Sequence, residues 1–312
     1  MKERKDIIIY YGHAEFPDKN ALAHRVIANA KILEKIGYKV ILIGGDRSLA
    51  MEKDILDTKS SVHSFDYYSY RYPQSFFEWL RHMTSISPVK RVCEQFPGRV
   101  KYIIFTGIGF LNTIKLLNYG RKMKIAIISD TVDWFSRSND RFPISIIKNI
   151  DTFLNMHIAK PLVKNIICIS SFLKSFYKKK HCNVLLLPSL IDNNDPKYNS
   201  HKYIPSEDNV KFFYAGSPGT KERMDYVVRA VNELINEGFR VSLDICGISK
   251  DEFIKKYGID TLFNEEKIKF YGRLPNSICL KMIQESDFCT FAREVSLANS
   301  AGFPTKFSES LA

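Results

Sequence analysis

The sequence lacks any run of about 18 apolar residues, the length that a membrane-spanning helix needs, so it predicts no transmembrane segment. Its first residues, Met-Lys-Glu-Arg-Lys-Asp, lead directly into an apolar strand pattern, without the apolar region of a secretory signal. The six cysteines show no paired spacing typical of a metal site, and most stand in apolar runs, which favours buried thiols in a reducing compartment. We therefore expect a cytoplasmic protein.

Several motifs of other protein classes are missing as well. The loop after the first strand pattern lacks Gly-x-Gly-x-x-Gly, which disfavours a dinucleotide cofactor. There is no Asp-x-Asp motif for a metal-bound diphosphate, and the seven histidines stand apart from any second ligand at metal spacing. No internal repeat or low-complexity segment appears. We therefore expect neither a metal nor another cofactor.

The charge of the chain is large and uneven. Its 312 residues allow one large or two ordinary domains, and the hydrophobic fraction of 45% is enough for a sizeable core. Residues 1–190 hold 30 Lys and Arg against 16 Asp and Glu, which gives +14, whereas residues 191–312 give −2. A basic half indicates an anionic partner, which is a membrane surface, a nucleic acid or a phosphorylated substrate. A merely soluble basic surface is the alternative.

Short apolar runs alternate with amphipathic stretches along the whole chain, which predicts an α/β protein built from doubly wound parallel sheets. A polar segment with two prolines separates two such series, so we expect a first domain at 1–190, a linker at 191–209 and a second domain at 210–312. The expected strands are 6–11, 38–43, 61–65, 100–105, 124–129, 165–169, 183–187, 210–215, 241–246, 268–271 and 288–291. The main expected helices are 21–36, 143–159, 172–180, 251–257 and 276–286, with others ending near 119 and 236.

The last residues of the chain suit a nucleotide. Pro304 fits the first turn of a helix, where free N–H groups and the helix dipole favour anions. Lys306 and Glu309 are three residues apart and share a helix face. A lysine there suits a phosphate, and a carboxylate one turn further suits the hydroxyls of a ribose. The alternative is an ordinary amphipathic helix with an exposed Lys–Glu pair.

The stretch at 300–312, Ser-Ala-Gly-Phe-Pro-Thr-Lys-Phe-Ser-Glu-Ser-Leu-Ala, resembles the donor-binding motif of retaining glycosyltransferases of family 4. It is most similar to the capsule and O-antigen branch, where Gly-Phe-Pro-Thr-Lys-Phe-x-Glu is typical. The resemblance implies that Lys306 meets the pyrophosphate of a nucleotide-diphosphate sugar and that Glu309 meets its ribose. Gly302 and Thr305 would complete this part of the donor site.

A second basic loop follows the first strand of the second domain. Gly216 ends the strand, and Lys221 and Arg223 stand shortly before the next helix. The resemblance implies that a basic residue of this loop meets the donor phosphates, with Lys221 the best match and Arg223 a substitute. Many family members carry an arginine directly after the glycine, where this chain has Ser217. The alternative is a solvated loop with a basic helix start.

The acceptor side is expected in the first domain. The loop that opens at Gly12 is similar to one that borders the acceptor in the resembled branch, and the resemblance makes Asn20 and Arg25 its polar contacts. Their alternative roles are a helix cap for Asn20 and a solvated helix face for Arg25.

Two aspartates and a tryptophan follow another strand. Ligand crevices lie at the carboxyl ends of parallel strands, and Asp130, Asp133 and Trp134 stand at such an end. Similar enzymes often carry an acid–Trp pair here, so both aspartates are candidates to orient the acceptor hydroxyl or take its proton, beside Trp134. The alternative is a pair of loop aspartates that cap the following segment.

Residues 67–96 interleave aromatic side chains with arginine, lysine and histidine. On one helix, this mixture suits an anionic membrane interface. The same mixture would suit a nucleic acid, and a core helix with a basic outer face is the third alternative.

The resemblance implies a GT-B fold, in which two Rossmann-like domains face a cleft. It implies a retaining transferase that moves sugar to a lipid-linked or oligosaccharide acceptor in surface-polysaccharide synthesis, peripheral at the inner face of the cell membrane. Family members continue past the motif with a further strand and closing helices, and Ala301 stands where many carry a sugar-binding glutamate. We therefore expect an incomplete second domain. The alternatives are an inactive fragment that at most binds nucleotide or membrane and, ranked lowest, a nucleic-acid-binding protein, for which no motif appears.

Overall fold

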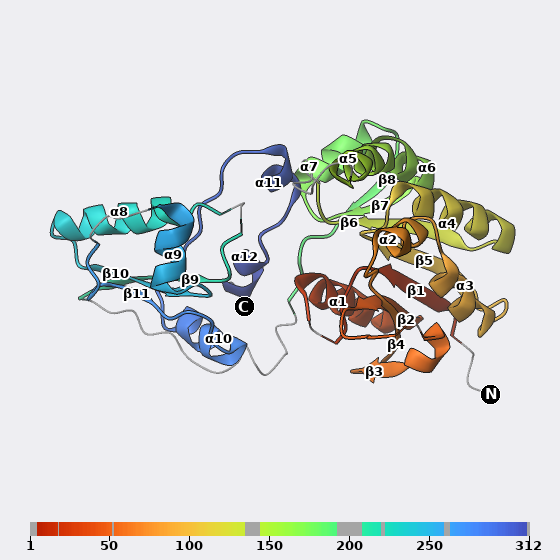
Figure 1. The fold of residues 1–312 in the computed structure, drawn as a ribbon, viewed down its shortest axis with the longest axis horizontal. Coiled ribbons are helices and arrows are strands. Elements are labelled where there is room, and N and C mark those ends of the chain that lie inside the picture. The colour runs from red at the N-terminus through yellow and green to blue at the C-terminus, as the bar shows by residue number, and fades with distance from the viewer. Residues whose placement is uncertain are drawn as a thin grey trace. The chain divides into compact units, whose positions relative to one another are not determined.

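The structure is a computed structural model that describes residues 5–17, 19–51, 53–134, 144–191, 208–219, 222–258 and 263–310, with Asn276, Thr305 and Glu309 described by their backbone alone. The chain divides into two compact units, each with its own sheet (Figure 1). The first unit contains Met1–Leu190 and the short stretch Ser300–Phe303, and the second contains Ile191–Asn299 and Pro304–Ala312. Most of the expected linker lies outside the described residues.

The first unit is built on an eight-stranded sheet with the order β3-β4-β2-β1-β5-β6-β7-β8. All neighbouring strands are parallel except β3, which pairs antiparallel with β4 at the edge. The strands are β1 (Ile7–Gly12), β2 (Lys39–Asp46), β3 (Ser60–Val62), β4 (Phe65–Arg71), β5 (Val100–Thr106), β6 (Ala126–Thr131), β7 (Asn165–Cys168) and β8 (Asn183–Leu186).

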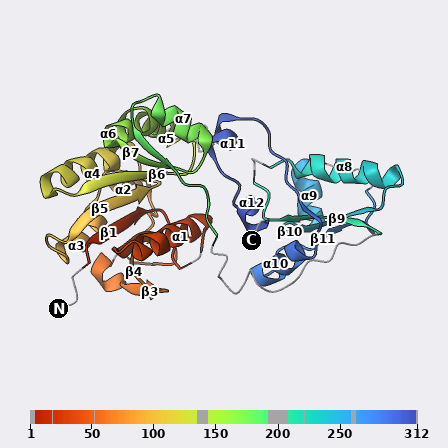
Figure 2. The ribbon, with the colours of Figure 1, turned by 180° about the vertical axis from the view of Figure 1, so that it is seen from behind.

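Helices lie on both faces of this sheet (Figures 1 and 2). They are α1 (Ala21–Lys35), the 3₁₀ turn η1 (Ile55–Thr58), α2 (Phe76–His82), α3 (Ser87–Glu94), α4 (Phe110–Met123), α5 (Ile144–Leu154), the π-helical turn η2 (Asn155–Ala159), α6 (Lys160–Val163) and α7 (Ser171–Lys178). Because successive side chains of a strand point to opposite faces, β1 supplies two cores. Ile7 and Ile9 pack in the cluster that holds α3 and α4, whereas Ile8 and Tyr10 pack in the cluster that holds α1.

The strand order of the first unit reverses direction at β1, which lies between β2 and β5. Gly12 ends β1 beside Thr106 of β5, and a Cβ on this glycine would lie 2.1 Å from the Thr106 carbonyl oxygen. The glycine therefore lets two strands come together at the switch point, where doubly wound sheets bind ligands.

The second unit is a four-stranded parallel sheet in the order β11-β10-β9-β12, which has its own switch point at β9. Its core gathers Tyr214, Leu243 and Ile245 of the sheet with Val228 and Phe253 of two helices. The elements are β9 (Val210–Ala215), α8 (Met224–Asn236), β10 (Val241–Cys246), α9 (Lys250–Tyr257), β11 (Ile268–Phe270), α10 (Asn276–Gln284), β12 (Phe288–Cys289), α11 (Leu297–Ala301) and α12 (Thr305–Ser310).

The prediction of α/β structure with Rossmann-like sheets is confirmed, and most boundaries fall within two residues of those expected. The expectation of a single helix within residues 67–96 was wrong. Their start belongs to β4, and α2 and α3 follow as two separate short helices. The strand expected at 38–43 continues through Gly44 and Gly45 to Asp46, the end of β2. Four of the six cysteines are buried, Cys279 is half-buried and Cys289 is exposed. None of the described helices has the length and apolar character needed to cross a membrane.

Candidate functional site

In the second unit, one buried carboxylate gathers two cations near the end of β9. Glu222 is 5% exposed and accepts hydrogen bonds from Lys306 Nζ at 2.9 Å and from Arg293 Nη2 at 3.1 Å. The phenol of Tyr214, a residue of β9, donates to the other carboxylate oxygen. The two cations come from positions 71 and 84 residues further along the chain, so tertiary folding assembles this cluster.

Lys306 lies against a glycine at the end of β9. Gly216 has a φ of +141°, a conformation that favours glycine, and a Cβ there would lie 2.3 Å from Lys306 Cε and 2.8 Å from its Nζ. Gly247 follows β10 with a φ of +103°, and its Cβ would lie 2.3 Å from the Gly216 carbonyl oxygen. The two glycines allow the lysine to lie close to the backbone at the carboxyl ends of two neighbouring strands.

The pKa shifts favour an ionised carboxylate at Glu222 beside a neutral phenol at Tyr214. Burial opposes ionisation of Glu222, but the hydrogen bonds from Tyr214 and Lys306 outweigh it and lower the pKa of the carboxyl group. Burial and the hydrogen bond to Glu222 raise the pKa of Tyr214, so its phenol keeps its proton. Arg293 Nε–H is buried and has no hydrogen-bond partner among the described residues. The cluster therefore carries two cations against one anion and keeps one unused buried donor.

Of the residues predicted to bind the donor, the structure brings Lys306 and Gly216 together. The alternative was an exposed Lys306–Glu309 pair. Among the described residues, Lys306 instead forms an ion pair with Glu222. Arg223 has other contacts: its guanidinium donates to Asp225 at 2.9 and 2.7 Å and also bonds Glu294.

The remaining predicted donor residues are only partly described. Gly302 is half-buried in the stretch that groups with the first unit. Thr305 begins α12 and Glu309 lies near its end, but their side chains fall outside the described part of the structure, and so does the whole of Lys221. The roles expected for these four residues stay predictions.

In the first unit, Arg25 and Asp130 form a fully buried ion pair. Their side chains are 4% and 0% exposed, and the guanidinium donates from Nη2 at 2.8 Å and from Nε at 2.9 Å. The phenol of Tyr10 donates to the same carboxylate at 2.5 Å, and Asn29 donates to that phenol at 3.1 Å. The carbonyl of Pro188 accepts the Arg25 Nη1–H at 3.0 Å. This network joins β1, α1, β6 and the segment after β8.

These contacts correct two alternative roles taken from the sequence. Arg25 does not lie on a solvated helix face, and Asp130 is not a loop cap, because it lies in β6 and binds a side chain 105 residues away. Burial would lower the pKa of Arg25, but Asp130 outweighs it and raises that pKa. The geometry supports a structural role for the pair, and their roles toward an acceptor stay predictions.

Asn20 caps α1. Its side-chain oxygen accepts from Ala23 N at 2.9 Å, which satisfies one of the free N–H groups at the helix start. Its side-chain amide also donates to the carbonyl of His13 at 3.2 Å. The alternative role of Asn20 as a helix cap is therefore confirmed, while contact with an acceptor stays a prediction.

Trp134 packs in an aromatic group next to the end of β6. Its ring centroid lies 4.9 Å from that of Phe176, 5.6 Å from that of Phe172 and 6.0 Å from that of His157. Trp134 and its neighbour Asp133 are both half-buried. Their predicted acceptor roles remain compatible with this placement and stay predictions.

Two further groups were missed in the sequence. Lys160 begins α6 and is 7% exposed, and burial lowers its pKa to about 8 despite the nearby charge of Asp130. His13 follows β1, and its Nε2 lies 3.4 Å from that of His82. Burial, with His82, lowers the pKa of His13 to about 4, so this imidazole is neutral at pH 7. In the sequence, the one sign that Lys160 is buried is its place as a single cation in the mainly apolar stretch 153–163.

The described residues contain no group of three or more His, Cys, Asp or Glu side chains placed to hold a metal ion. What the Glu222 cluster can hold is an anion, since its lysine and its arginine meet at the end of a strand where ligands of such sheets bind.

No protein-family model matches the sequence, and no curated protein sequence matches it. Solved structures do match. The chain is similar to α,α-trehalose 6-phosphate synthase from Burkholderia multivorans, with a TM-score of 0.65 and 10% identity over 98% of this chain and 81% of that one.

Two further matches are a galactosyltransferase and a synthase. The lipopolysaccharide outer core galactosyltransferase WaaB has a TM-score of 0.59 and 14% identity over 98% and 78% of the two chains. Starch synthase IV from Arabidopsis thaliana has a TM-score of 0.60 and 11% identity over 92% and 78%. At these identities the likeness shows the fold, and this chain has the GT-B fold of Rossmann-like domains.

Proposed function

We propose that this protein is a glycosyltransferase that moves a sugar from a nucleotide-diphosphate donor. The observation that carries the proposal is the meeting of Lys306 and Arg293 on Glu222, beside Gly216 at the switch point of the second sheet. The same lysine is the one that the donor-binding motif points to, so motif and geometry agree on one residue. A diphosphate suits this place because it brings several acceptor oxygens to two cations and one unused N–H.

Nucleotides recur in the structures that share this fold. The starch synthase structure holds ADP and acarbose, and two structures of HepE from Anabaena hold UDP with glucose and UDP-glucose. By analogy, the donor of this chain is a nucleoside diphosphate attached to a hexose, and we propose no metal because the sequence has no Asp-x-Asp motif.

In the proposed reaction, the bond between the anomeric carbon and the diphosphate oxygen breaks, and the diphosphate departs with the electron pair. Lys306 and Arg293 offset the charge that develops on it, and such fixed charges contribute most when they are already in position. The acceptor hydroxyl bonds to the anomeric carbon with retention of configuration, and its proton passes to the carboxylate of Asp133. Asp133 and Trp134 are the proposed acceptor-side residues, and Glu309 is the proposed ribose ligand.

We propose a lipid-linked or oligosaccharide acceptor of surface-polysaccharide synthesis, such as that of a capsule or O-antigen. Turnover tests this directly. The purified chain is incubated with UDP-, GDP- and ADP-hexoses and a membrane-lipid extract, and nucleoside diphosphate release is measured. NMR of the product then gives its anomeric configuration. Release that depends on the extract, with retention, supports the proposal. Nucleotide binding without turnover supports the inactive alternative, and salt-sensitive binding of DNA or RNA in its place contradicts the proposal.

A specific observation also favours contact with an anionic membrane. No residue of α5 is buried, and Ile146, Ile150 and Phe153 are 47%, 53% and 59% exposed at a spacing that places them on one helix face. Phe77 of α2 is 80% exposed. Lys148 Nζ lies 5.9 Å from the ring centroid of Trp79, so the two helices are neighbours.

We propose that this α2–α5 surface enters the headgroup region while the basic first half, with its charge of +14, meets anionic lipid. Co-sedimentation with vesicles of equal parts phosphatidylglycerol and phosphatidylcholine tests it. Binding should fall in the double variant Phe77→Ser with Ile150→Ser, and not in Ile36→Ser, a matched change at a 64% exposed position. Equal binding by all three proteins would contradict the proposal.

A further inference from the structure

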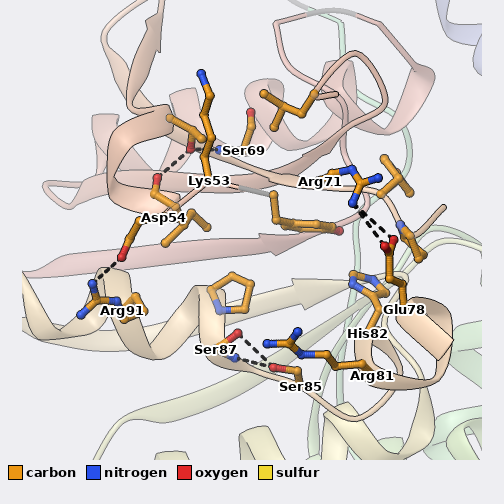
Figure 3. A pocket seen from close by; sticks show the side chains of 17 residues that line it. Lys53, Asp54, Ser69, Arg71, Glu78, Arg81, His82, Ser85, Ser87 and Arg91 are labelled. Carbon is orange, nitrogen blue, oxygen red and sulfur yellow. Dashed lines mark hydrogen bonds and ion pairs between the residues drawn. The ribbon is translucent and has the colours of Figure 1, made fainter. Parts of the chain in front are cut away.

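A polar pocket lies in the first unit. It encloses about 350 Å³ between η1, the end of β4, α2 and the start of α3, which is within the range of small-ligand sites. Figure 3 shows that its charged side chains come from the loop before η1, the end of β4, α2 and α3; they are Lys53, Asp54, Arg71, Glu78, Arg81 and Arg91.

The lining of this pocket is positively charged. Lys53, Arg71, Arg81 and Arg91 face two acids, Asp54 and Glu78, which leaves a formal charge of +2. Burial lowers the pKa of His82, which also lines the pocket, so this imidazole adds no charge at pH 7. A phosphate monoester carries about −1.5 to −2 at pH 7, so the charges match.

The two ion pairs of the pocket differ. Figure 3 shows them at opposite ends. At one end, Arg91 Nη2 bonds Asp54 at 2.5 Å. At the other end, Arg71 Nη1 lies 3.4 Å from both carboxylate oxygens of Glu78, longer than the roughly 2.7–2.9 Å of a good charge-assisted hydrogen bond. Arg71 is therefore held loosely by its acid.

Arg71 also has an unused donor. Its Nε–H is buried and has no hydrogen-bond partner among the described residues, although a buried donor without an acceptor is unfavourable. Glu78 is held by another hydrogen bond, since its Oε2 accepts the backbone N–H of Gln74 at 2.8 Å. This hydrogen bond, with Arg71, lowers the pKa of Glu78, so the carboxylate stays ionised. The Nε–H of the Arg71 guanidinium therefore lacks an acceptor among the described residues.

Hydroxyl groups complete the lining. Ser85 and Ser87 line the pocket at the start of α3, and their hydroxyls are 3.0 Å apart. The phenols of Tyr70 and Tyr72 donate to backbone carbonyls at 2.8 and 3.2 Å, which leaves their oxygens able to accept. Such a lining suits a ligand that has hydroxyl groups as well as a phosphate.

We propose that this pocket binds the phosphate monoester of a small hydroxylated molecule, with Arg71 as its main ligand. The inference concerns the first unit alone and does not depend on the proposed transfer reaction. The phosphate oxygen would accept the Arg71 Nε–H and replace the long contacts to Glu78, while Arg81 adds charge from α2.

Calorimetric titration of the full chain with glucose 6-phosphate tests the proposal, with inorganic phosphate as competitor. Arg71→Gln should weaken binding by at least about tenfold. Arg71→Lys, which keeps the charge but has no Nε–H, should recover only a small part. Arg121→Gln, a matched change at an exposed residue of α4, should bind as the wild type does. Thermal unfolding of each variant shows whether it is folded.

Two further measurements locate the phosphate and its source. The ¹⁵N NMR signal of Arg71 Nε should shift on addition of glucose 6-phosphate. Lys306→Gln separates the pocket from the Glu222 cluster, and loss of binding in that variant, with Arg71→Gln unaffected, would overturn the proposal. Binding only to vesicles that contain phosphatidic acid, and lost in Arg71→Gln, would identify a lipid headgroup as the source of the same phosphate chemistry. Binding of neither probe would also overturn it.

Discussion

Each unit has a carboxylate that binds an arginine at the end of a central strand, but the two groups are built differently. In the first unit, Asp130 is wholly buried and both of its oxygens are bonded to Arg25. In the second unit, Lys306 and Arg293 keep 25% and 21% of their side chains exposed around Glu222, and Arg293 Nε–H has no described partner.

This difference separates a group that holds the fold from a group that can bind a ligand. A buried ion pair with good geometry adds little to the free energy of unfolding while it is intact. Removing one partner costs much more, because it leaves an unpaired charge in the interior. In a partly exposed cluster with surplus positive charge, the cations can bind a ligand anion in place of the carboxylate with little loss of free energy. The comparison therefore predicts that the first network matters mainly for stability and the second mainly for binding.

The largest expected effect is on the first network. Asp130→Asn should lower the free energy of unfolding by about 3–5 kcal/mol, because Arg25 would remain buried without a counter-charge. The unfolding transition of the first unit in denaturant measures this loss of free energy. Asp54→Asn, at an exposed ion pair, is the control and should cost far less, because solvent screens this pair. Equal losses in the two variants would remove the distinction between the networks.

Lys160, buried near the same aspartate, gives a pH-dependent test. Its pKa falls from 10.5 in the unfolded chain to about 8, so between these values the unfolded state binds more protons than the folded state. Stability should therefore rise with pH over that window, by up to about 3 kcal/mol relative to a Lys160→Met variant. The difference between the two unfolding free energies, measured from pH 7 to 11, checks it. A difference that does not change with pH would show that burial does not lower the pKa of Lys160.

Glu222→Gln should cost less than Asp130→Asn, about 1–2 kcal/mol, because its cations reach solvent once their charged acceptor is gone. Glutamine still offers Tyr214 an acceptor, so the variant should fold. Denaturant unfolding measures the loss, and a loss as large as that of Asp130→Asn would mean that this cluster also serves chiefly to hold the fold.

The smallest expected effect is at the start of α1. Asn20→Ala removes the cap of the helix that carries Arg25 and should cost about 1 kcal/mol, whereas Asn20→Asp keeps the acceptor and should cost little. Thermal unfolding distinguishes the two. If Asn20→Ala also abolished sugar transfer while stability barely changed, the residue would have the predicted acceptor role in addition to the cap.

Local features of the fold could be read from the sequence, and long-range pairs could not. A run rich in β-branched residues predicted β1 and a run rich in aromatic residues predicted β9, because such patterns depend on neighbouring residues. The prediction for residues 67–96 was wrong because the strand β4, which has a period of two residues, is followed closely by short helices with the same aromatic composition. Composition alone does not separate the two periods.

The candidate site could be predicted in part. The motif identified Lys306, but its partner Glu222 lies 84 residues earlier and reads in sequence as one acid between two bases. Arg293 had no signal at all. Arg25 and Asp130 were each singled out separately, and only the packing of α1 against β6 shows that they form a pair. Partners of this kind depend on topology, which the local pattern does not contain.

The central claim is that Lys306 binds the diphosphate of a nucleotide donor, and calorimetric titration of UDP, GDP and ADP into the wild type and Lys306→Gln tests it most directly. Lys281→Gln, at a 59% exposed side chain of α10, is the matched control. We expect at least one nucleotide to bind the wild type and the control alike, and Lys306→Gln to bind it about 10- to 100-fold more weakly. Equal affinity in all three proteins, or binding of none of the nucleotides, would contradict the account.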